Sequence, residues 1–410
     1  MRRILVNYAK PGMILARDLH DGYGHVLLEK GTPLGPEHVQ ALARVGVSEL
    51  LIEDERVNDI VVSPIISPEL RGAAAEALTQ ILARLETVQQ PERTSVGTGQ
   101  MRLGAQSAAG GIENDANIGS DLTLIRRVTF EMVQQLTPTP TGDPTISGCH
   151  SAEDYDFILP VKTAEISLLM GKVAGLNQTQ LVNLGMAALL QNIGYTRVFP
   201  NNLTQKPGAL WEELAFVRAW RTGNNGPGHE KTPITAAELQ AVWKHAEHGE
   251  EILKQANALD AEVIEIVLQH HERWNGSGYP RELKAGEILP PARILAIADA
   301  CCTMASERPY REAFLPLEVA ELIVAYSGEL YDPEMVRIFI ENVPTFPTGV
   351  MVRLNTGEVG IVTDSNVGLI GRPKVRVCND KDGRPIPRPY EVDLAEPQNR
   401  DKLIATTVEY

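Results

Sequence analysis

Apolar residues recur every three to four positions through most of the chain, the spacing of a helix with one buried face. In residues 69–85, for example, Leu78, Ile81, Leu82 and Leu85 fall on one face. The same pattern predicts further helices over 121–136, 152–175, 178–193, 210–220, 236–256, 261–273, 291–306, 317–325 and 333–341. Their spacing predicts an all-α core of roughly eight helices with short connections.

Both ends of the chain have a different pattern. Near the start, short strands are expected at 4–6, within 19–28 and at 48–52, with a helix over 32–45. Near the end, apolar and polar residues alternate at 350–354, 358–363 and 374–378, which predicts strands. We therefore expect a multidomain protein, with an all-α helical core flanked by a small N-terminal α+β domain and a C-terminal β-rich domain.

The expected domain boundaries follow from these changes and from one biased segment. Residues 89–120 are rich in Gly, Ser, Ala, Gln and Asn, which indicates a linker or long loop. The predicted units are 1–60 (accessory α+β domain), 61–120 (helix plus flexible linker), 121–345 (helical domain) and 346–410 (small β domain).

The composition indicates a globular protein with an acidic surface. Of 410 residues, 53 are acidic and 38 basic, giving a formal net charge of −15. This charge disfavours general adhesion to nucleic acid, although one small anionic ligand can still bind in a local basic pocket. No apolar run is long enough to span a membrane. The four cysteines have neither metal-ligand nor disulfide-framework spacing, so a cytoplasmic location is expected.

The candidate chemistry lies between residues 269 and 311. His270, His271 and Glu272 end an apolar helical run, and a Gly-rich turn follows at once. Histidine and carboxylate together suit a divalent metal. Further along, Arg308 and Arg311 flank Pro309-Tyr310 and form a candidate phosphate clamp.

This stretch resembles the HD-GYP family, helical metal-dependent phosphodiesterases that act on cyclic dimeric GMP. The resemblance rests on the following motifs, in the family's order and spacing: His270-His271-Glu272, Gly276-x-Gly278-Tyr279-Pro280, Ala292-Arg293-Ile294, Ala298-Asp299 and Arg308-Pro309-Tyr310-Arg311. It extends weakly over residues 121–344. The resemblance implies metal ligands at His245, His270, His271 and Asp299. It also implies ligand contacts from Gly278, Tyr279, Pro280, Arg293, Arg308 and Arg311. For Glu272, we favour a role as acceptor of a histidine N–H over direct binding of the metal.

The first half of the family's site does not match. Where the family has His-Asp-x-Gly-Lys, this chain has Gln191, Asn192 and Tyr195 at the histidine, aspartate and lysine positions. Leu159 falls on the early-helix histidine. Amides are neutral and weak donors to a divalent cation, and leucine cannot coordinate one. Half of a dinuclear site is therefore missing, so we name no catalytic residue.

Three functions stay open at this point. The preferred one is a degenerate bacterial signalling protein that binds a cyclic dinucleotide or a protein partner, with hydrolysis lost or weak. The second is an active phosphodiesterase with a reduced metal site, and the third is a non-catalytic scaffold. The expected cofactor is one divalent transition metal, iron or manganese, or no metal at all. For Arg293, pairing with acidic groups of the protein is the alternative to ligand binding.

Overall fold

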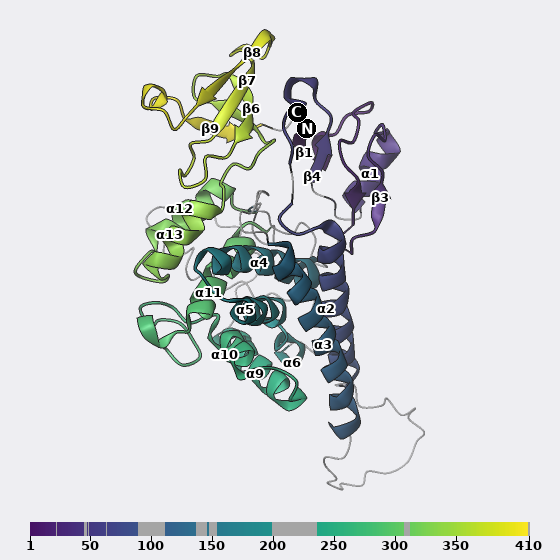
Figure 1. Ribbon diagram of the computed structural model, residues 1–410, viewed down its shortest axis with the longest axis vertical. Coiled ribbons are helices and arrows are strands. Elements are labelled where there is room, and N and C mark those ends of the chain that lie inside the picture. The colour runs from purple at the N-terminus through teal and green to yellow at the C-terminus, as the bar shows by residue number, and fades with distance from the viewer. Residues whose placement is uncertain are drawn as a thin grey trace.

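The structure is a computed structural model. It describes residues 1–21, 23–44, 47, 49–62, 64–88, 111–136, 146, 154–198, 236–306 and 312–408. A helical domain forms the larger part, and a C-terminal sheet domain and a small N-terminal domain adjoin at one end of it (Figure 1). The multidomain fold class predicted from the hydrophobic pattern is therefore confirmed.

The N-terminal domain is a small α+β unit. Its elements are β1 (Arg2–Leu5), β2 (Leu19–His20), β3 (Val26–Leu28), α1 (Pro36–Arg44) and β4 (Glu49–Ile52). Strand β1 pairs with β4, and β2 pairs with β3, both antiparallel. Alternate residues of β1 and β4 point inward, where Ile4, Leu50 and Ile52 pack with Leu15 and Leu34.

The helical domain has one continuous apolar core, which runs in sequence from Ile65 to Val343. Its helices are α2 (Pro68–Val88), α3 (Gly111–Gln135), α4 (Asp154–Val173), α5 (Gln178–Leu190), α6 (Tyr195–Val198), α8 (Ala236–Trp243), α9 (His245–Ala256), α10 (Ala261–Gln269), α11 (Pro290–Met304), α12 (Pro316–Ala325) and α13 (Pro333–Asn342). Helix α5 is buried on all sides from Leu181 to Leu190, so it forms the centre of the domain.

Three helix predictions need correction. Helix α3 begins at Gly111, where the composition predicted a linker continuing to residue 120. Residues 236–256 form two helices, because α8 ends at Trp243 and α9 begins at His245. Helix α10 stops at Gln269, short of the predicted end at 273. The predicted helix over 210–220 and most of the predicted linker, residues 89–110, lie outside the described residues.

The C-terminal domain is a five-stranded antiparallel sheet in the order β8-β7-β6-β5-β9. The strands are β5 (Met351–Leu354), β6 (Val359–Asp364), β7 (Lys374–Asn379), β8 (Pro385–Asp393) and β9 (Ile404–Thr407). The first three match the predicted strands. Strand β8 carries Pro385, Pro387 and Pro389, which lack a backbone N–H, and it lies at the sheet edge, where prolines are tolerated.

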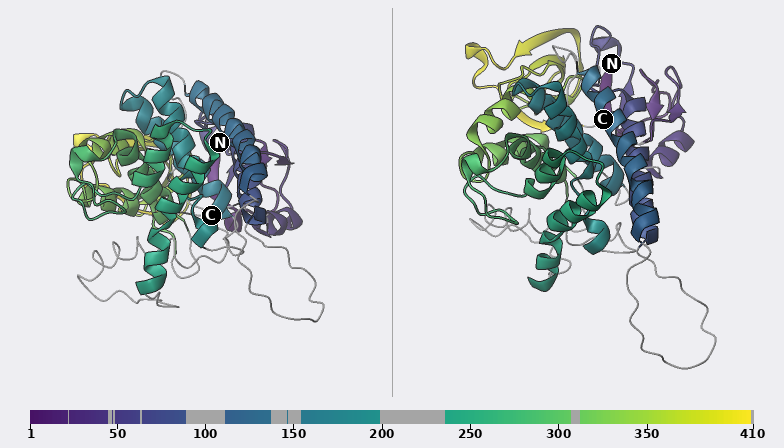
Figure 2. Two further views of the ribbon diagram at one scale, coloured as in Figure 1. Left: turned by 90° about the horizontal axis from the view of Figure 1, so that it is seen from below. Right: turned by 60° about the horizontal axis from the view of Figure 1, so that its bottom comes forward.

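The two terminal domains pack against each other, as the right-hand view in Figure 2 shows. Val57, Ile60 and Val62, which follow β4, share an apolar cluster with residues of the C-terminal sheet. Arg376 on β7 joins the domains electrostatically, because it donates to Asp59 at 2.6 Å. It also donates to Glu391 on β8 of its own sheet, at 2.9 Å.

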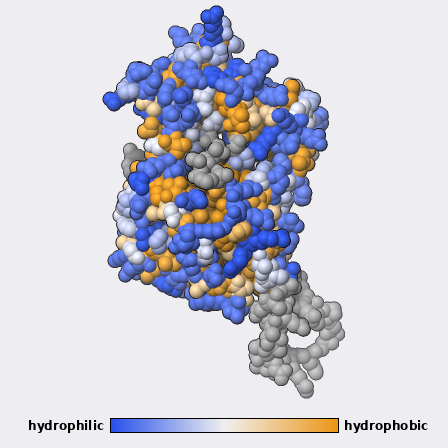
Figure 3. All heavy atoms as spheres, viewed as in Figure 1, coloured by the Kyte–Doolittle hydropathy of each residue, from blue (hydrophilic) through white to orange (hydrophobic). Residues whose placement is uncertain are grey.

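Hydrophilic side chains dominate the face drawn in Figure 3, and apolar ones are concentrated near its middle. None of the described helices combines the length and apolar character needed to cross a membrane.

Candidate metal centre

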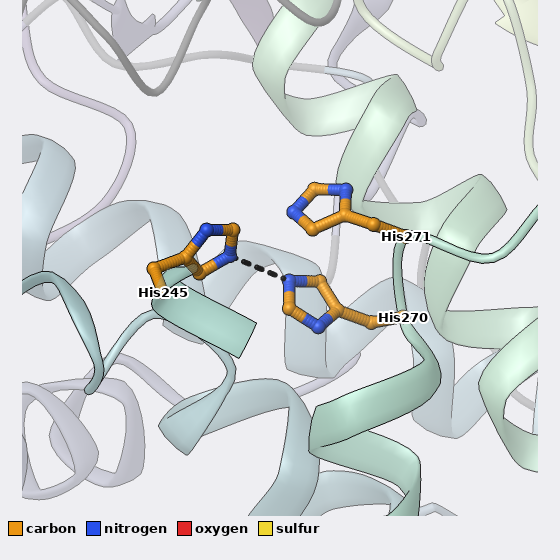
Figure 4. Close-up of side chains that lie close together, drawn as sticks. All are labelled: His245, His270 and His271. Carbon is orange, nitrogen blue, oxygen red and sulfur yellow. Dashed lines mark hydrogen bonds between the residues drawn. The ribbon is translucent and has the colours of Figure 1, made fainter. Parts of the chain in front are cut away.

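Three histidine side chains from two parts of the helical domain converge in its interior. His245 is the first residue of α9, and His270 and His271 directly follow α10 (Figure 4). Each offers a ring nitrogen, and these nitrogens all lie within 4.8 Å of one another. The residues are 0%, 1% and 8% exposed, in that order. Among the described His, Cys, Asp and Glu side chains, this is the group close enough to share one ion.

The positions of the three histidines follow from how the helices pack. Helix α10 buries Val263, Ile266 and Val267 in the core, which fixes the point where His270 leaves the helix. The turn between α5 and α6 approaches the start of α9 very closely. A Cβ atom at Gly194 would lie 1.9 Å from the His245 carbonyl oxygen, so only glycine fits there.

The hydrogen bonds of the rings determine which nitrogens are available. Nδ1 of His245 donates to the Val242 carbonyl at 2.7 Å, and Nδ1 of His270 donates to the Val267 carbonyl at 2.5 Å. A carbonyl oxygen only accepts, so both Nδ1 atoms carry a hydrogen. In a neutral ring, Nε2 is then an unprotonated acceptor that can bind a metal.

The distance between the two Nε2 atoms fits a shared cation. They face each other at 3.3 Å. Two nitrogens bound to one tetrahedral ion at about 2.05 Å lie about 3.3 Å apart. Without a cation or a proton between them, two such lone pairs repel each other. The donor set and its geometry therefore fit one divalent transition metal.

Burial keeps these imidazoles neutral. It lowers the pKa of His270 to about 4 and places the pKa of His271 well below its usual value. The positive charge of Arg273 acts in the same direction on both histidines. Metal ions bind the neutral form of histidine, so this environment makes the site ready for a cation at neutral pH.

The first half of the site, which does not match the family's motif, is filled by protein contacts. Gln191, 0% exposed, donates its Nε2–H to Oδ1 of Asp299 at 2.7 Å. The buried Oε1 of Gln191 makes no hydrogen bond within the described part of the chain. Tyr195 stacks on the His245 ring, with centroids 4.1 Å apart and planes at 13°. Leu159, on α4, is 3% exposed and belongs to the apolar core. Asn192, which immediately follows Gln191, is partly exposed.

The Gly-rich turn after His271 presses its aromatic residue against the centre. Tyr279, which precedes a cis peptide bond to Pro280, stacks on His271 with centroids 4.9 Å apart. Gly278 is needed for this path, because a Cβ there would lie 2.4 Å from the His271 carbonyl oxygen. Glu272 anchors the turn: its carboxylate accepts the backbone N–H of Arg281 at 2.8 Å and of Leu283 at 2.9 Å. The carboxylate of Glu272 thus accepts from backbone N–H groups, where a histidine N–H was expected.

The predicted arginine contacts have different outcomes. Arg293 is paired within the protein: it donates to Asp332 at 3.1 Å and to the Ile288 carbonyl at 2.8 Å, and its contact with a ligand stays a prediction. Its guanidinium also lies 5.2 Å from the centroid of the Trp274 ring. Arg308 and Arg311 lie outside the described residues.

Sequence reasoning missed one aromatic residue beside the centre. Trp243, the last residue of α8, stacks on Tyr279 with centroids 5.5 Å apart and planes at 23°. Its position two residues before His245 was the one available signal.

Two family models match the chain. Residues 228–335 match an HD domain, and residues 351–405 match a KOW domain associated with HD domains. The second match covers the C-terminal sheet.

Curated relatives match over longer stretches. The cyclic di-GMP phosphodiesterase PA4108 of Pseudomonas aeruginosa is 25% identical over 73% of this chain and 67% of its own length. A cyclic di-GMP phosphodiesterase of Thermotoga maritima is 34% identical over 44% of this chain and 43% of its own. Another from Vibrio cholerae is 42% identical over 38% of this chain and 27% of its own length. The chain therefore spans less than half the length of the last two relatives. These matches confirm the resemblance read from the sequence motifs.

Proposed function

We propose a function in cyclic dinucleotide signalling for this chain, because residues 228–335 match an HD domain and the chain is similar to curated cyclic di-GMP phosphodiesterases. The protein binds a cyclic dinucleotide at the three-histidine centre and hydrolyses it weakly or not at all. The proposal extends from the relatives' names to this chain, so it needs support from the chain's own residues.

One observation carries the proposal: the hydrogen bond from Gln191 to Asp299. A carboxylate that binds a cation directs its oxygens at the cation. Here Oδ1 of Asp299 faces an amide N–H at 2.7 Å. The N–H group and a cation cannot both occupy that short approach. We therefore propose that Oδ1 of Asp299 anchors Gln191 and is not available to a metal.

The remaining ligands support a centre with one metal. His245, His270 and His271 present buried ring nitrogens within 4.8 Å of one another, and these suit iron or manganese as well as zinc. A divalent ion held there would supply positive charge beside a phosphate of the ligand. Stabilising both the attacking and the leaving oxygen of a phosphodiester usually takes two ions, so loss of one predicts weak turnover.

A second candidate function is a phosphodiesterase that works with one metal. The 3.3 Å separation of the two Nε2 atoms favours it, because a complete three-nitrogen set leaves open positions on the ion. In this case turnover would depend on the same histidines.

Binding and turnover of cyclic di-GMP by the full chain separate these functions. The chain is loaded with Mn²⁺ or Fe²⁺, affinity is measured by calorimetry, and products are separated by chromatography. His270→Ala removes a ligand, and His248→Gln, at a partly exposed position on α9, is the matched control. We expect metal-dependent binding, lost in His270→Ala, without appreciable product. Turnover at ordinary enzymatic rates, lost in His270→Ala, would establish the second candidate, and absence of any binding would reject both.

A further inference from the structure

Trp243 is an exposed aromatic residue beside a buried centre. Tryptophan has a very large apolar side chain, yet 40% of the surface of Trp243 is exposed. Large apolar residues that stay exposed next to a candidate site are more informative than those scattered over a surface. The last turn of α8 places it two residues before His245.

The ring of Tyr279 connects Trp243 to the metal centre. The indole stacks on Tyr279 at 5.5 Å, and Tyr279 in turn stacks on His271 at 4.9 Å. The Tyr279 ring also meets the edge of His245 at 6.3 Å. The Tyr279 ring thus contacts both His271 and His245, and it is partly buried, so Trp243 is the most exposed ring of this series.

We propose that Trp243 is the stacking platform for a planar purine base of the bound nucleotide. This inference rests on the proposed function and adds to it a residue that the motifs did not identify. A base stacked on the indole would lie at the outer end of the ring series, with its phosphate directed toward the three histidines. Tyr279 supports the indole from behind, which is a positioning role.

The chemistry of the platform fits a base better than an aliphatic group. Indole has the largest π-face among side chains, and base–aromatic stacking contributes roughly 1–3 kcal/mol per base. A base covering the indole would remove exposed apolar surface from water, which an isolated phosphate or sugar would not do. The formal net charge of −15 disfavours the phosphates at long range, so apolar stacking is a suitable source of affinity.

Variants of Trp243 in the full, metal-loaded chain test this proposal with cyclic di-GMP as the probe. Trp243→Phe keeps an aromatic face, whereas Trp243→Leu keeps only apolar bulk. We expect Trp243→Leu to weaken binding by roughly ten- to a hundred-fold. Trp243→Phe should weaken it by less than about five-fold. Binding should also quench tryptophan fluorescence in the wild type, and Trp243→Phe should lose most of this quenching.

Two controls keep the result specific. Phe130→Leu changes another exposed aromatic residue, on α3, and should leave affinity unchanged. Metal content should be equal in all variants. If Trp243 only supported the structure, its replacement would disturb the histidines and lower the metal content.

Equal affinity of Trp243→Leu and the wild type would overturn the platform while leaving the proposed function intact. Loss of metal along with affinity in Trp243→Leu would overturn it as well. If the wild type binds no cyclic di-GMP, the proposed function fails and the platform fails with it.

Discussion

Replacing Gln191 by glutamate tests the contact on which the proposed function rests. The substitution keeps the size of the side chain and exchanges the N–H donor for a carboxylate oxygen. That oxygen would lie about where Nε2 now lies, 2.7 Å from Oδ1 of Asp299. Two carboxylates so close in a partly buried place do not both stay ionised at neutral pH.

The magnitude follows from comparing two ways to relieve the repulsion. Two unit charges 2.7 Å apart repel by roughly 6 kcal/mol at an effective dielectric constant of about 20. Protonating one carboxyl with an ordinary pKa of about 4.3 costs about 4 kcal/mol at pH 7 and about 1 kcal/mol at pH 5. Protonation is the cheaper route, and the new O–H···O bond offsets part of its cost. We expect Gln191→Glu to lower the free energy of unfolding by about 2–4 kcal/mol at pH 7.

The sign of the pH dependence is fixed by the shared proton. The folded-state pKa of this carboxyl pair would be raised above its unfolded value, so the stability is present at low pH and lost as pH rises through the raised pKa. Urea unfolding of chelator-treated protein at pH 5 and pH 7 measures this. Adding Mn²⁺ at pH 7 should restore stability, because a cation between two carboxylates removes their repulsion.

Asn192→Asp is the matched control, since it makes the same charge change one residue later. The Asn192 side chain is partly exposed and makes no hydrogen bond within the described residues. Its substitution should change stability by less than about 0.5 kcal/mol. A Gln191→Glu protein as stable as the wild type at pH 7, or equally destabilised at both pH values, would refute the placement of Gln191 against Asp299.

Two further predictions concern ion pairs. Arg293→Ala should destabilise the protein by roughly 3–5 kcal/mol in urea unfolding, because it leaves the buried Asp332 carboxylate without its cation; a fully stable variant with weakened ligand binding would contradict the structural role. Arg376 lowers the pKa of Asp59 to about 2, below its unfolded value of about 3.9, so this contribution is present above pH 4 and lost as pH falls toward 2. Since Asp59 is 62% exposed, Asp59→Asn should lower the free energy of unfolding by less than about 1 kcal/mol at pH 7 and low salt. A larger destabilisation, or one that stays the same between pH 3 and pH 2, would contradict this ion pair.

Much of the fold was predictable because its determinants are local. The helical periodicity of α5, α11 and α13 and the alternation in β5, β6 and β7 belong to the elements themselves. Residues 111–120 were not predicted as helix, because their Gly, Asn and Ser content resembles that of a loop. Strand β8 was not predicted because it contains prolines, which a sheet accommodates at its edge.

The site was predictable in part, for the same reason. The motifs identified His245, His270 and His271, which the structure brings together. They could not show that Gln191 donates to Asp299, since 108 residues separate the two and tertiary packing alone makes them neighbours. Nor could they show that Arg293 pairs with Asp332, because tertiary packing brings these two residues together. Metal binding itself stays a prediction.

The number of metal ions bound per chain tests the central claim most directly. The full chain, purified without chelator and then dialysed against Mn²⁺ or Fe²⁺, is analysed for its elements alongside His271→Ala. The account predicts about one equivalent in the wild type and almost none in a folded His271→Ala protein. Two equivalents in the wild type, or one that survives in His271→Ala, would contradict a single centre on the three histidines.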